Sequence, residues 1–564
     1  MGFLIAVVVL ALLVITAATT LGPRLGVAAP LLLVVTGIGT SLLPLVPAVH
    51  VEPEWVLTGV LPPLLYSASV SMPAMNFRRE FAAISGLSVA LVVASALILG
   101  LFFAWVIPGL GLGWGIALGA IVSPTDAAAT PIVKRAGAPT RVATVLEGES
   151  LLNDATALVL LRAAIAGAVA SVSLWGVLGN FVYAVAVAGV IGYAVGRLNL
   201  AVRSRVNDAT VNTVISFTVP FLVAIPAEEL GASGLVAAVV AGLVTGHGAA
   251  RVLSPQHRLS DAQNWRTVEL ILEGAVFLVM GLQLSTIVGD VRADHAGIGT
   301  AAGIVVGALM LTILVRAAYV APLLAALRVQ AGRGAQIKPQ IAIVQDRLDD
   351  PDAAETAFDE IRGWRLPQSA DGIDRLRARL RRGLASIDHY LAHPLGWREG
   401  TIVVWAGMRG VVTLAAAQTL PEDTPSRSLL ILIVFLIATG SLLLQGSTLP
   451  RLVTLVKPND IDQSAAYDER VRLMALLEQT AAAVTAEHVE DHPHADHCVD
   501  PGRPQPPADD GKRLTLAVIA AQRRALLDAR DDGTFTAGAL NAALAAIDAD
   551  QISLELKGAP TDYA

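Results

Sequence analysis

Residues 145–156 read Val-Leu-Glu-Gly-Glu-Ser-Leu-Leu-Asn-Asp-Ala-Thr, within a mostly apolar stretch from 143 to 169. This stretch is long enough to cross a bilayer as a helix, which takes about 20 residues. It nevertheless carries the acidic side chains Glu147, Glu149 and Asp154. Charges inside a span are costly, so they indicate either a functional site or a structural pair that satisfies the charge.

Helical spacing places the polar side chains of this stretch along one side. Ser150 and Asp154 are four residues apart, and so are Glu149 and Asn153. Residues four apart lie one above the other on an α-helix, so two neighbouring polar ridges run along it. We therefore expect this side to face protein or a water-filled cavity.

Composition indicates that most of the chain lies in a membrane. Of its 564 residues 54% are hydrophobic and 15% charged, and the mean hydropathy is +0.63. A soluble protein carries about 25% charged residues, so this chain has too little polar surface to coat a globule. The single cysteine, Cys498, excludes a disulfide framework. The segment from Lys457 onward holds 10 Lys and Arg against 19 Asp and Glu, which excludes a basic nucleic-acid-binding tail.

A window of span length finds about thirteen candidate transmembrane segments. They lie near 3–20, 26–46, 55–74, 82–107, 112–134, 143–169, 173–196, 209–228, 232–249, 268–288, 298–321, 400–420 and 428–455. We therefore predict an all-α, polytopic membrane protein. Its parts are transmembrane helices 1–11 at 1–328, a charged cytoplasmic insert at 329–398, transmembrane helices 12 and 13 at 399–456, and a small α-helical cytoplasmic tail at 457–564.

Basic residues in alternate connections predict the orientation. These residues are Arg24, Arg78, Arg79, Lys134, Arg135, Arg141, Arg197, Arg203, Arg205, Arg251, Arg258 and Arg266. Because Lys and Arg favour the cytoplasmic side, the N-terminus is expected outside and the C-terminus in the cytoplasm.

The insert and the tail also show helical patterns. Apolar residues of the insert recur at three- and four-residue steps, at Leu376, Leu380, Leu384 and Ile387. This pattern predicts an amphipathic helix, solvated or on the membrane surface. The tail has helical runs near 464–487, 512–530 and 535–556.

The fifth predicted span contains Ser-Pro-Thr-Asp-Ala-Ala-Ala-Thr-Pro at 123–131. Proline removes a backbone donor and disrupts a helix, which frees carbonyl groups. A broken helix at mid-membrane is tolerated where it is buried in protein or lines a cavity, and its ends bind ions. Asp126 beside the prolines favours such a functional break over an ordinary kink.

The twelfth predicted span carries Arg409 within Trp-Ala-Gly-Met-Arg-Gly at 405–410, about ten residues into an apolar segment. A guanidinium at this depth needs a carboxylate partner. The intramembrane candidates are Glu147, Glu149, Asp154 and Asp126. Gly407 and Gly410 permit close approach or unwinding of the backbone. Spans five and twelve run in opposite directions, which is compatible with an inverted repeat.

Four motifs follow one another along the chain: Leu-Pro-Pro-Leu-Leu at 61–65, Ser-Pro-Thr-Asp-Ala-Ala-Ala-Thr at 123–130, Glu-Gly-Glu-Ser-Leu-Leu-Asn-Asp at 147–154 and Gly-Met-Arg-Gly-Val-Val-Thr-Leu at 407–414. With these motifs the chain resembles the bacterial type of the cation:proton antiporter-1 family, the sodium/proton exchangers, over about residues 1–455. The resemblance implies two inverted six-helix repeats, a homodimer, and an ion site where the broken spans five and twelve cross.

The resemblance also implies residue roles. By motif it makes Asp154 the cation- and proton-binding carboxylate, Ser150 and Thr125 its co-ligands, Asn153 its partner in an Asn-Asp pair, Asp126 the holder of the broken helix ends, and Glu149 with Arg409 a buried ion pair. Archaeal relatives carry a glutamate at the position of Ser67, so one possible ligand is missing here.

These roles predict a monovalent cation/proton antiporter of the cell membrane. Burial disfavours the charged form of a carboxylate, so we hypothesise that Na⁺ and H⁺ compete for Asp154. Asn153 in place of a second acid implies electroneutral exchange, serving intracellular pH and Na⁺ homeostasis. Li⁺ or K⁺ as the cation stays open. Neither a cofactor, a nucleic-acid partner nor an enzymatic reaction is expected.

Two other kinds of transport protein remain as alternatives. A sodium-coupled symporter of an organic anion also uses broken helices, but it needs further polar residues to hold its solute, and the core has few Arg or Lys. A cation channel or sensor would show no obligatory exchange. The chain lacks the H-E-x-x-H and G-x-S-x-G patterns of zinc and serine hydrolases.

Some residues fall outside this scheme. A cluster in the tail contains metal-ligand types at His488, His492, His494, His497 and Cys498. It is either a flexible titratable run or a regulatory metal or pH patch. Glu228, Glu229, Glu269 and Glu273 have no assigned role, and Arg162 and Arg316 are expected near span ends or in internal pairs.

Overall fold

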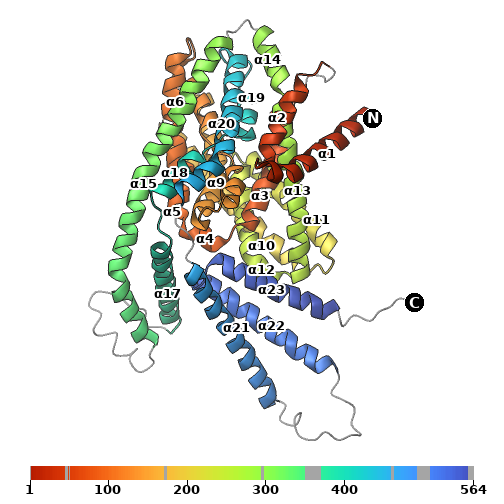
Figure 1. Cartoon of the computed structure of the whole chain (residues 1–564), viewed down its shortest axis with the longest axis vertical. Helices are drawn as coiled ribbons and strands as arrows, with labels where there is room; N and C mark the ends of the chain where they lie inside the picture. The colour runs from red at the N-terminus through yellow and green to blue at the C-terminus, as the bar shows by residue number, and fades with distance from the viewer. Residues whose placement is uncertain are drawn as a thin grey trace. The chain divides into compact units, whose positions relative to one another are not determined.

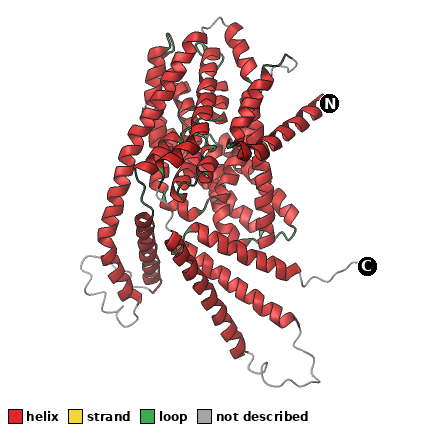
Figure 2. Cartoon of the chain, in the orientation of Figure 1, coloured by secondary structure: helices red, strands yellow, loops and turns green. Residues whose placement is uncertain are grey.

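The computed structural model describes residues 2–44, 49, 51–169, 174–293, 298–349, 370–458, 463–491 and 508–556. Within these ranges the regular elements are helices and no strand occurs (Figure 2). The predicted all-α class is therefore confirmed.

The helices of the membrane part follow one another without long loops (Figure 1). They are α1 (Gly2–Leu25), α2 (Ala29–Ser41), η1 (Trp55–Val60), α3 (Leu61–Ser71), α4 (Ala74–Arg79), α5 (Phe81–Ser85), η2 (Gly86–Leu91), α6 (Val92–Val106), α7 (Gly111–Val122), α8 (Ala129–Arg135), α9 (Thr140–Val169), α10 (Leu174–Arg203), α11 (Ala209–Glu229), α12 (Gly234–Val252), α13 (Pro255–Leu282), α14 (Leu284–Ala293), α15 (Ile298–Asp349), α18 (Trp397–Trp405), α19 (Val411–Gln418) and α20 (Arg427–Val456). The elements η1 and η2 are π-helical turns that run directly into α3 and α6.

Among the described residues, nine helical segments are long and apolar enough to cross a membrane. Shorter apolar helices lie at Ala29–Ser41, Trp55–Ser71 and Gly111–Val122. The predicted spans at 112–134 and 400–420 are each two short helices, α7 with α8 and α18 with α19. The chain is thus a multi-pass membrane protein with broken helices. The count of thirteen spans, the inverted repeats, the domain boundaries and the orientation of the termini stay predictions.

The chain divides into two compact units. The first consists of Met1–Val252, Ser260–Ala326 and Leu395–Asp460, and the second of Leu253–Leu259, Leu327–Pro394 and Ile461–Ala564. The candidate site lies wholly in the first unit.

Two groups of helices pack within the first unit. One group contains α6, α7, α8 and α9 with α19 and α20, and the other contains α3, α10, α11 and α12. Small residues let the backbones approach: a Cβ at Gly119 of α7 would collide with the carbonyl oxygen of Ala96 on α6. The first group contains the broken helices, and Figure 1 shows α9, α18 and α20 gathered together.

The second unit is also helical. Leu376 and Leu380 of α17 (Ala370–Ala392) pack against Ile341 and Val344 of α15. The predicted amphipathic helix is therefore present, but Leu376 and Leu380 on its apolar face pack against α15 instead of facing solvent or lipid. This difference arises because α15 continues well beyond the predicted span end at 321.

The helices predicted in the tail are present as well. They are α21 (Gln463–Asp491), α22 (Ala508–Asp532) and α23 (Ala537–Leu556), which pack on one another. Arg258, at the start of α13 and within this unit, pairs with Asp548 of α23 at 2.5 Å.

Candidate functional site

The first break lies between the end of α7 at Val122 and the start of α8 at Ala129. Pro124 lies in this non-helical segment, as the sequence predicts. Asp126 Oδ1 accepts a hydrogen bond from the backbone N–H of Ala128 at 2.8 Å, and the carboxylate also accepts one from Val411. Asp126 thus binds the N-terminal ends of α8 and α19, which carry partial positive charge.

The second break lies between α18 and α19 and contacts the first. The backbone N–H of Asp126 donates to the carbonyl oxygen of Met408 at 2.8 Å. Gly410 precedes α19, and a Cβ at this position would overlap the Asp126 carboxylate. Glycine is therefore required for the two breaks to meet.

Arg409 lies against the C-terminal end of α7, which carries partial negative charge. Its Nε donates to the carbonyl oxygen of Val122 at 2.9 Å, and its Nη2 donates to that of Ser123 at 3.4 Å. A further donor reaches its own loop at Gly407. Each broken span therefore supplies a charge to the other: Asp126 to the start of α19, and Arg409 to the end of α7.

The predicted ion pair of Glu149 with Arg409 is wrong, because Arg316 of α15 takes both oxygens of Glu149. The two Nη–Oε distances are 2.5 and 2.8 Å, and both side chains are almost fully buried. Arg316 Nε also donates to the carbonyl of Val403, in the last turn of α18, at 2.9 Å. Of the two roles expected for Arg316, the internal pair is present, and α15 continues far beyond it.

Thr125 and Asn153 join the first break to α9. The Thr125 hydroxyl donates to Glu149 Oε1 at 3.0 Å. Asn153 Nδ2 donates to the carbonyl oxygen of Thr125 at 2.8 Å and to its hydroxyl oxygen at 2.9 Å. Asn153 thus satisfies a carbonyl that the break frees. The Ser150 hydroxyl donates to the carbonyl of Glu147 at 3.0 Å. The co-ligand roles of Thr125 and Ser150 stay predictions.

Asp154 lies beside the first break. Its side chain lines a small cavity between α7, α9 and α19, together with Pro124 and Val412. The other lining residues are Ala120, Ile121, Ala157, Leu158, Leu161 and Ala416, so Asp154 is the one charged group there. It is 8% exposed, and within the described ranges no donor hydrogen-bonds its carboxylate. A buried carboxylate in this state is suited to take up a cation or a proton.

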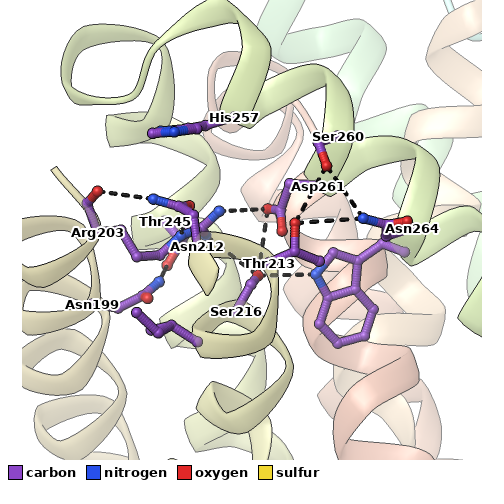
Figure 3. A network of polar contacts seen from close by, with 12 residues as sticks. Asn199, Arg203, Asn212, Thr213, Ser216, Thr245, His257, Ser260, Asp261 and Asn264 are labelled. Carbon is purple, nitrogen blue, oxygen red and sulfur yellow. Dashed lines mark hydrogen bonds and ion pairs between the residues drawn. The ribbon is translucent and has the colours of Figure 1, made fainter. Parts of the chain in front are cut away.

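A second buried polar network joins α10 and α11 of the other helix group to α13 (Figure 3). Arg203 at the end of α10 lies 3.0 Å from Asp261 of α13 and donates to Asn212 of α11 at 2.7 Å. Ser216 of α11 accepts a hydrogen bond from Trp265 Nε1 at 3.0 Å. The sequence pattern assigns Arg203 to a basic connection, but α10 continues to this residue and buries it.

Ser67 contacts one of the unassigned acids. Its hydroxyl donates to Oε1 of Glu269 on α13 at 2.5 Å. Neither the sequence motifs nor the periodicity points to this contact, since the two residues are 202 positions apart.

The tail cluster of metal-ligand types lies almost wholly outside the described residues. His488 is part of α21, whereas His492, His494, His497 and Cys498 lie outside them. Among the residues that the structure describes, no group of three or more His, Cys, Asp or Glu is arranged to hold a metal ion. The regulatory reading of this cluster stays a prediction.

Known proteins are similar to this chain in sequence and in fold. A family model described as the transmembrane sodium/hydrogen exchanger matches residues 8–346. An uncharacterized Na⁺/H⁺ exchanger of Mycobacterium bovis is 29% identical over 477 residues, which cover 82% of this chain and 76% of the relative. A sodium, potassium, lithium and rubidium/H⁺ antiporter of Bacillus subtilis is 32% identical over 306 residues, covering 52% of this chain and 45% of the relative.

A solved structure is similar as well. The sodium proton antiporter MjNhaP1 of Methanocaldococcus jannaschii matches with a TM-score of 0.56 and 16% identity, over 81% of this chain and 99% of that one. At this identity the likeness concerns the fold. Because the family model matches more than half of the chain, the resemblance inferred from the four motifs is confirmed. This chain belongs to the transmembrane sodium/hydrogen exchanger family.

Proposed function

We propose that the protein exchanges Na⁺ for H⁺ across the cell membrane, by competition of the two ions for Asp154. The observation that carries the proposal is this carboxylate, buried in an apolar cavity at the first break without a hydrogen-bond donor among the described residues. Oxygen atoms are the ligands of hard cations, and carbonyl groups that a broken helix frees can supply further oxygen ligands.

Competition at one carboxylate couples the two fluxes. A site loaded with either Na⁺ or H⁺ is neutral and crosses between the two access states. An empty, charged site crosses poorly in a low dielectric, which prevents uniport. Asn153, beside Asp154, adds no second charge, which supports electroneutral exchange. The name of the Bacillus relative includes potassium and lithium, so we propose Li⁺ and K⁺ as competing substrates.

The test measures exchange by the full-length chain in everted vesicles. Na⁺, Li⁺ or K⁺ is added, and dequenching of an acid-interior dye reports proton efflux. Asp154→Asn is expected to abolish dequenching, because the amide neither releases a proton nor binds a cation with charge. Glu147→Gln on the same helix is the matched control and should exchange normally, since its side chain is 33% exposed and outside the cavity.

Other outcomes identify other functions. Normal exchange by Asp154→Asn would show that Asp154 is not the shared site. Cation movement without proton counterflow would indicate a channel, and dependence on an added organic anion would indicate a symporter.

A further inference from the structure

The membrane helix made of α5, η2 and α6 meets α9 along one face. Glu80, Ile84 and Ser88 stand at four-residue spacing, and all three are buried. Residues at this spacing share one face of a helix. Both α5 and η2 pack against α9, so this face follows α9 toward the turn that carries the site residues.

The first two residues of this face fix how closely the helices approach. Arg141, at the start of α9, donates from Nε to Glu80 Oε1 at 2.6 Å and from Nη2 to Oε2 at 3.2 Å. Both side chains are almost fully buried. Further along, Ile84 lies against Gly148, where a Cβ would overlap the Ile84 side chain. The two helices are therefore in close contact at both levels.

Ser88, the third residue of the face, bonds to the main chain of α9. Its hydroxyl donates to the carbonyl oxygen of Glu149 at 3.0 Å, and Ser88 is fully buried. In an α-helix this carbonyl also accepts from the N–H four residues further on, which is that of Asn153. A carbonyl oxygen has two lone pairs and can accept both bonds. Ser88 is therefore bound to the helical turn from Glu149 to Asn153, directly before Asp154.

The π-helical turn η2 contains Ser88. Its hydrogen bonds span five residues instead of four, and such turns are frequent at functional sites. The wider turn rotates the helix that follows, so the face toward α9 does not continue. After η2, α6 packs mainly on α7, where Ala96 lies against Gly119. One membrane helix thus holds both α7 and α9, which line the cavity of Asp154.

The turn that Ser88 holds carries the central side chains of the site. Asn153 binds Thr125 at the first break, and Asp154 lines the cavity. A shift of this backbone would move Asp154 relative to the break. A hard cation needs several oxygen atoms at defined distances, whereas a proton needs one. Such a shift therefore weakens the binding of Na⁺ more than that of H⁺.

We propose that Ser88 is a positioning residue of the exchange site. Its hydroxyl holds the turn from Glu149 to Asn153 at the distance from the first break at which Asp154 shares a cation with further oxygen atoms. Ser88 does not bind the ion and acts through the backbone of α9. The inference rests on the proposed function, because it concerns the same Asp154 site.

The test measures the KM for Na⁺ in everted vesicles with the full-length chain, at several pH values. Ser88→Ala should raise this KM by about threefold to tenfold, the factor that one neutral hydrogen bond represents. The factor should be the same at each pH, because proton binding to Asp154 is unchanged. The maximal rate at saturating Na⁺ should change little.

Two variants show whether the hydroxyl itself is responsible. Ser88→Cys keeps the size of the side chain but is a weaker donor, so its KM should lie between those of the wild type and Ser88→Ala. Ser85→Ala is the matched control on the same helix. The Ser85 hydroxyl donates to the carbonyl of Ala82 within that helix at 3.3 Å, so its removal should leave KM unchanged. A raised KM in Ser88→Ala with the wild-type KM in Ser88→Cys would overturn the role of the hydrogen bond.

A merely structural role of Ser88 would give a different result. Ser88→Ala would then lower the amount of folded protein, and the remaining molecules would keep the wild-type KM at every pH, which would overturn the proposal. Should Ser88→Ala not fold, an unchanged KM in Ser88→Cys overturns it in the same way.

Failure of the positioning role is distinguishable from failure of the proposed function. If Ser88→Ala keeps the wild-type KM while Asp154→Asn is inactive, the positioning role is wrong and the exchange site stands. If Asp154→Asn exchanges normally, the proposed function fails and the positioning role fails with it.

Discussion

Among the buried pairs of an arginine with a carboxylate in the first unit, the pairs of Arg316 and Arg203 differ in what else their arginines contact. Arg316 binds both oxygens of Glu149 and the carbonyl of Val403 near the end of α18. Arg203 binds Asp261 and the side chain of Asn212, between unbroken helices. The first arginine compensates a helix end that the break leaves open, whereas the second compensates side chains only.

A buried ion pair therefore does not by itself mark a transport site. Buried pairs occur wherever a charge has to be satisfied, and they often contribute little net stability. The distinguishing feature here is the broken backbone beside the pair. The broken ends need Arg409, Asp126 and Arg316 as fixed compensating charges, and these leave Asp154 without a partner among the described residues.

The largest expected effects come from removing one carboxylate of each pair. Glu149→Gln and Asp261→Asn should each destabilise the fold by about 3–5 kcal/mol, because each leaves an arginine buried without its counter-charge. Thermal unfolding of the purified protein in detergent measures this loss.

The exchange rate per folded molecule then separates the two pairs. Glu149→Gln should also lower this rate, because Glu149 Oε1 accepts a hydrogen bond from the Thr125 hydroxyl at 3.0 Å. This bond keeps Thr125 in place at the first break. Asp261→Asn should leave the rate unchanged. Equal losses of exchange in both variants would mean that the two ion pairs do not differ in their importance for transport.

The broken helices could be predicted from the sequence, because proline and glycine change the backbone at their own positions. The residue types of Pro124 and Asp126 predict the first break, and the structure has the break there, between α7 and α8. The same holds for Gly410 before α19. The family followed from four local motifs in order along the chain.

Sequence reasoning failed where a partner comes from far along the chain. Glu149 meets Arg316 across 167 positions, and Ser67 meets Glu269 across 202. Arg316 stands five residues before a predicted span end, so nothing local separated a snorkelling arginine from a buried one. Only the continuation of α15 to Asp349 places it mid-helix.

A smaller loss of stability, but a clear loss of rate, is expected from Gly410→Ala. The added Cβ overlaps the Asp126 carboxylate and pushes the two breaks apart. Overpacking of this kind costs about 1–3 kcal/mol. Misplacement of the site by about 1 Å should slow exchange about 100-fold.

The matched control is Gly303→Ala in α15, where a Cβ meets no atom within 4 Å. This variant should exchange Na⁺ for H⁺ at the wild-type rate in vesicles. If Gly410→Ala did so as well, close contact between the two breaks would not be needed for transport.

The smallest effect is expected two residues from Glu149 in the same motif. Glu147 pairs with Lys134, and their side chains are 33% and 52% exposed. Positions two apart on a helix point to different faces, so Glu147 reaches the surface while Glu149 is buried. Lys134→Ala should change the free energy of unfolding by no more than about 1 kcal/mol, as for other exposed pairs, and leave exchange unchanged.

A loss of stability as large as that of Glu149→Gln would mean that the Glu-Gly-Glu motif acts as one unit. The division into a surface acid and a buried acid would then be wrong.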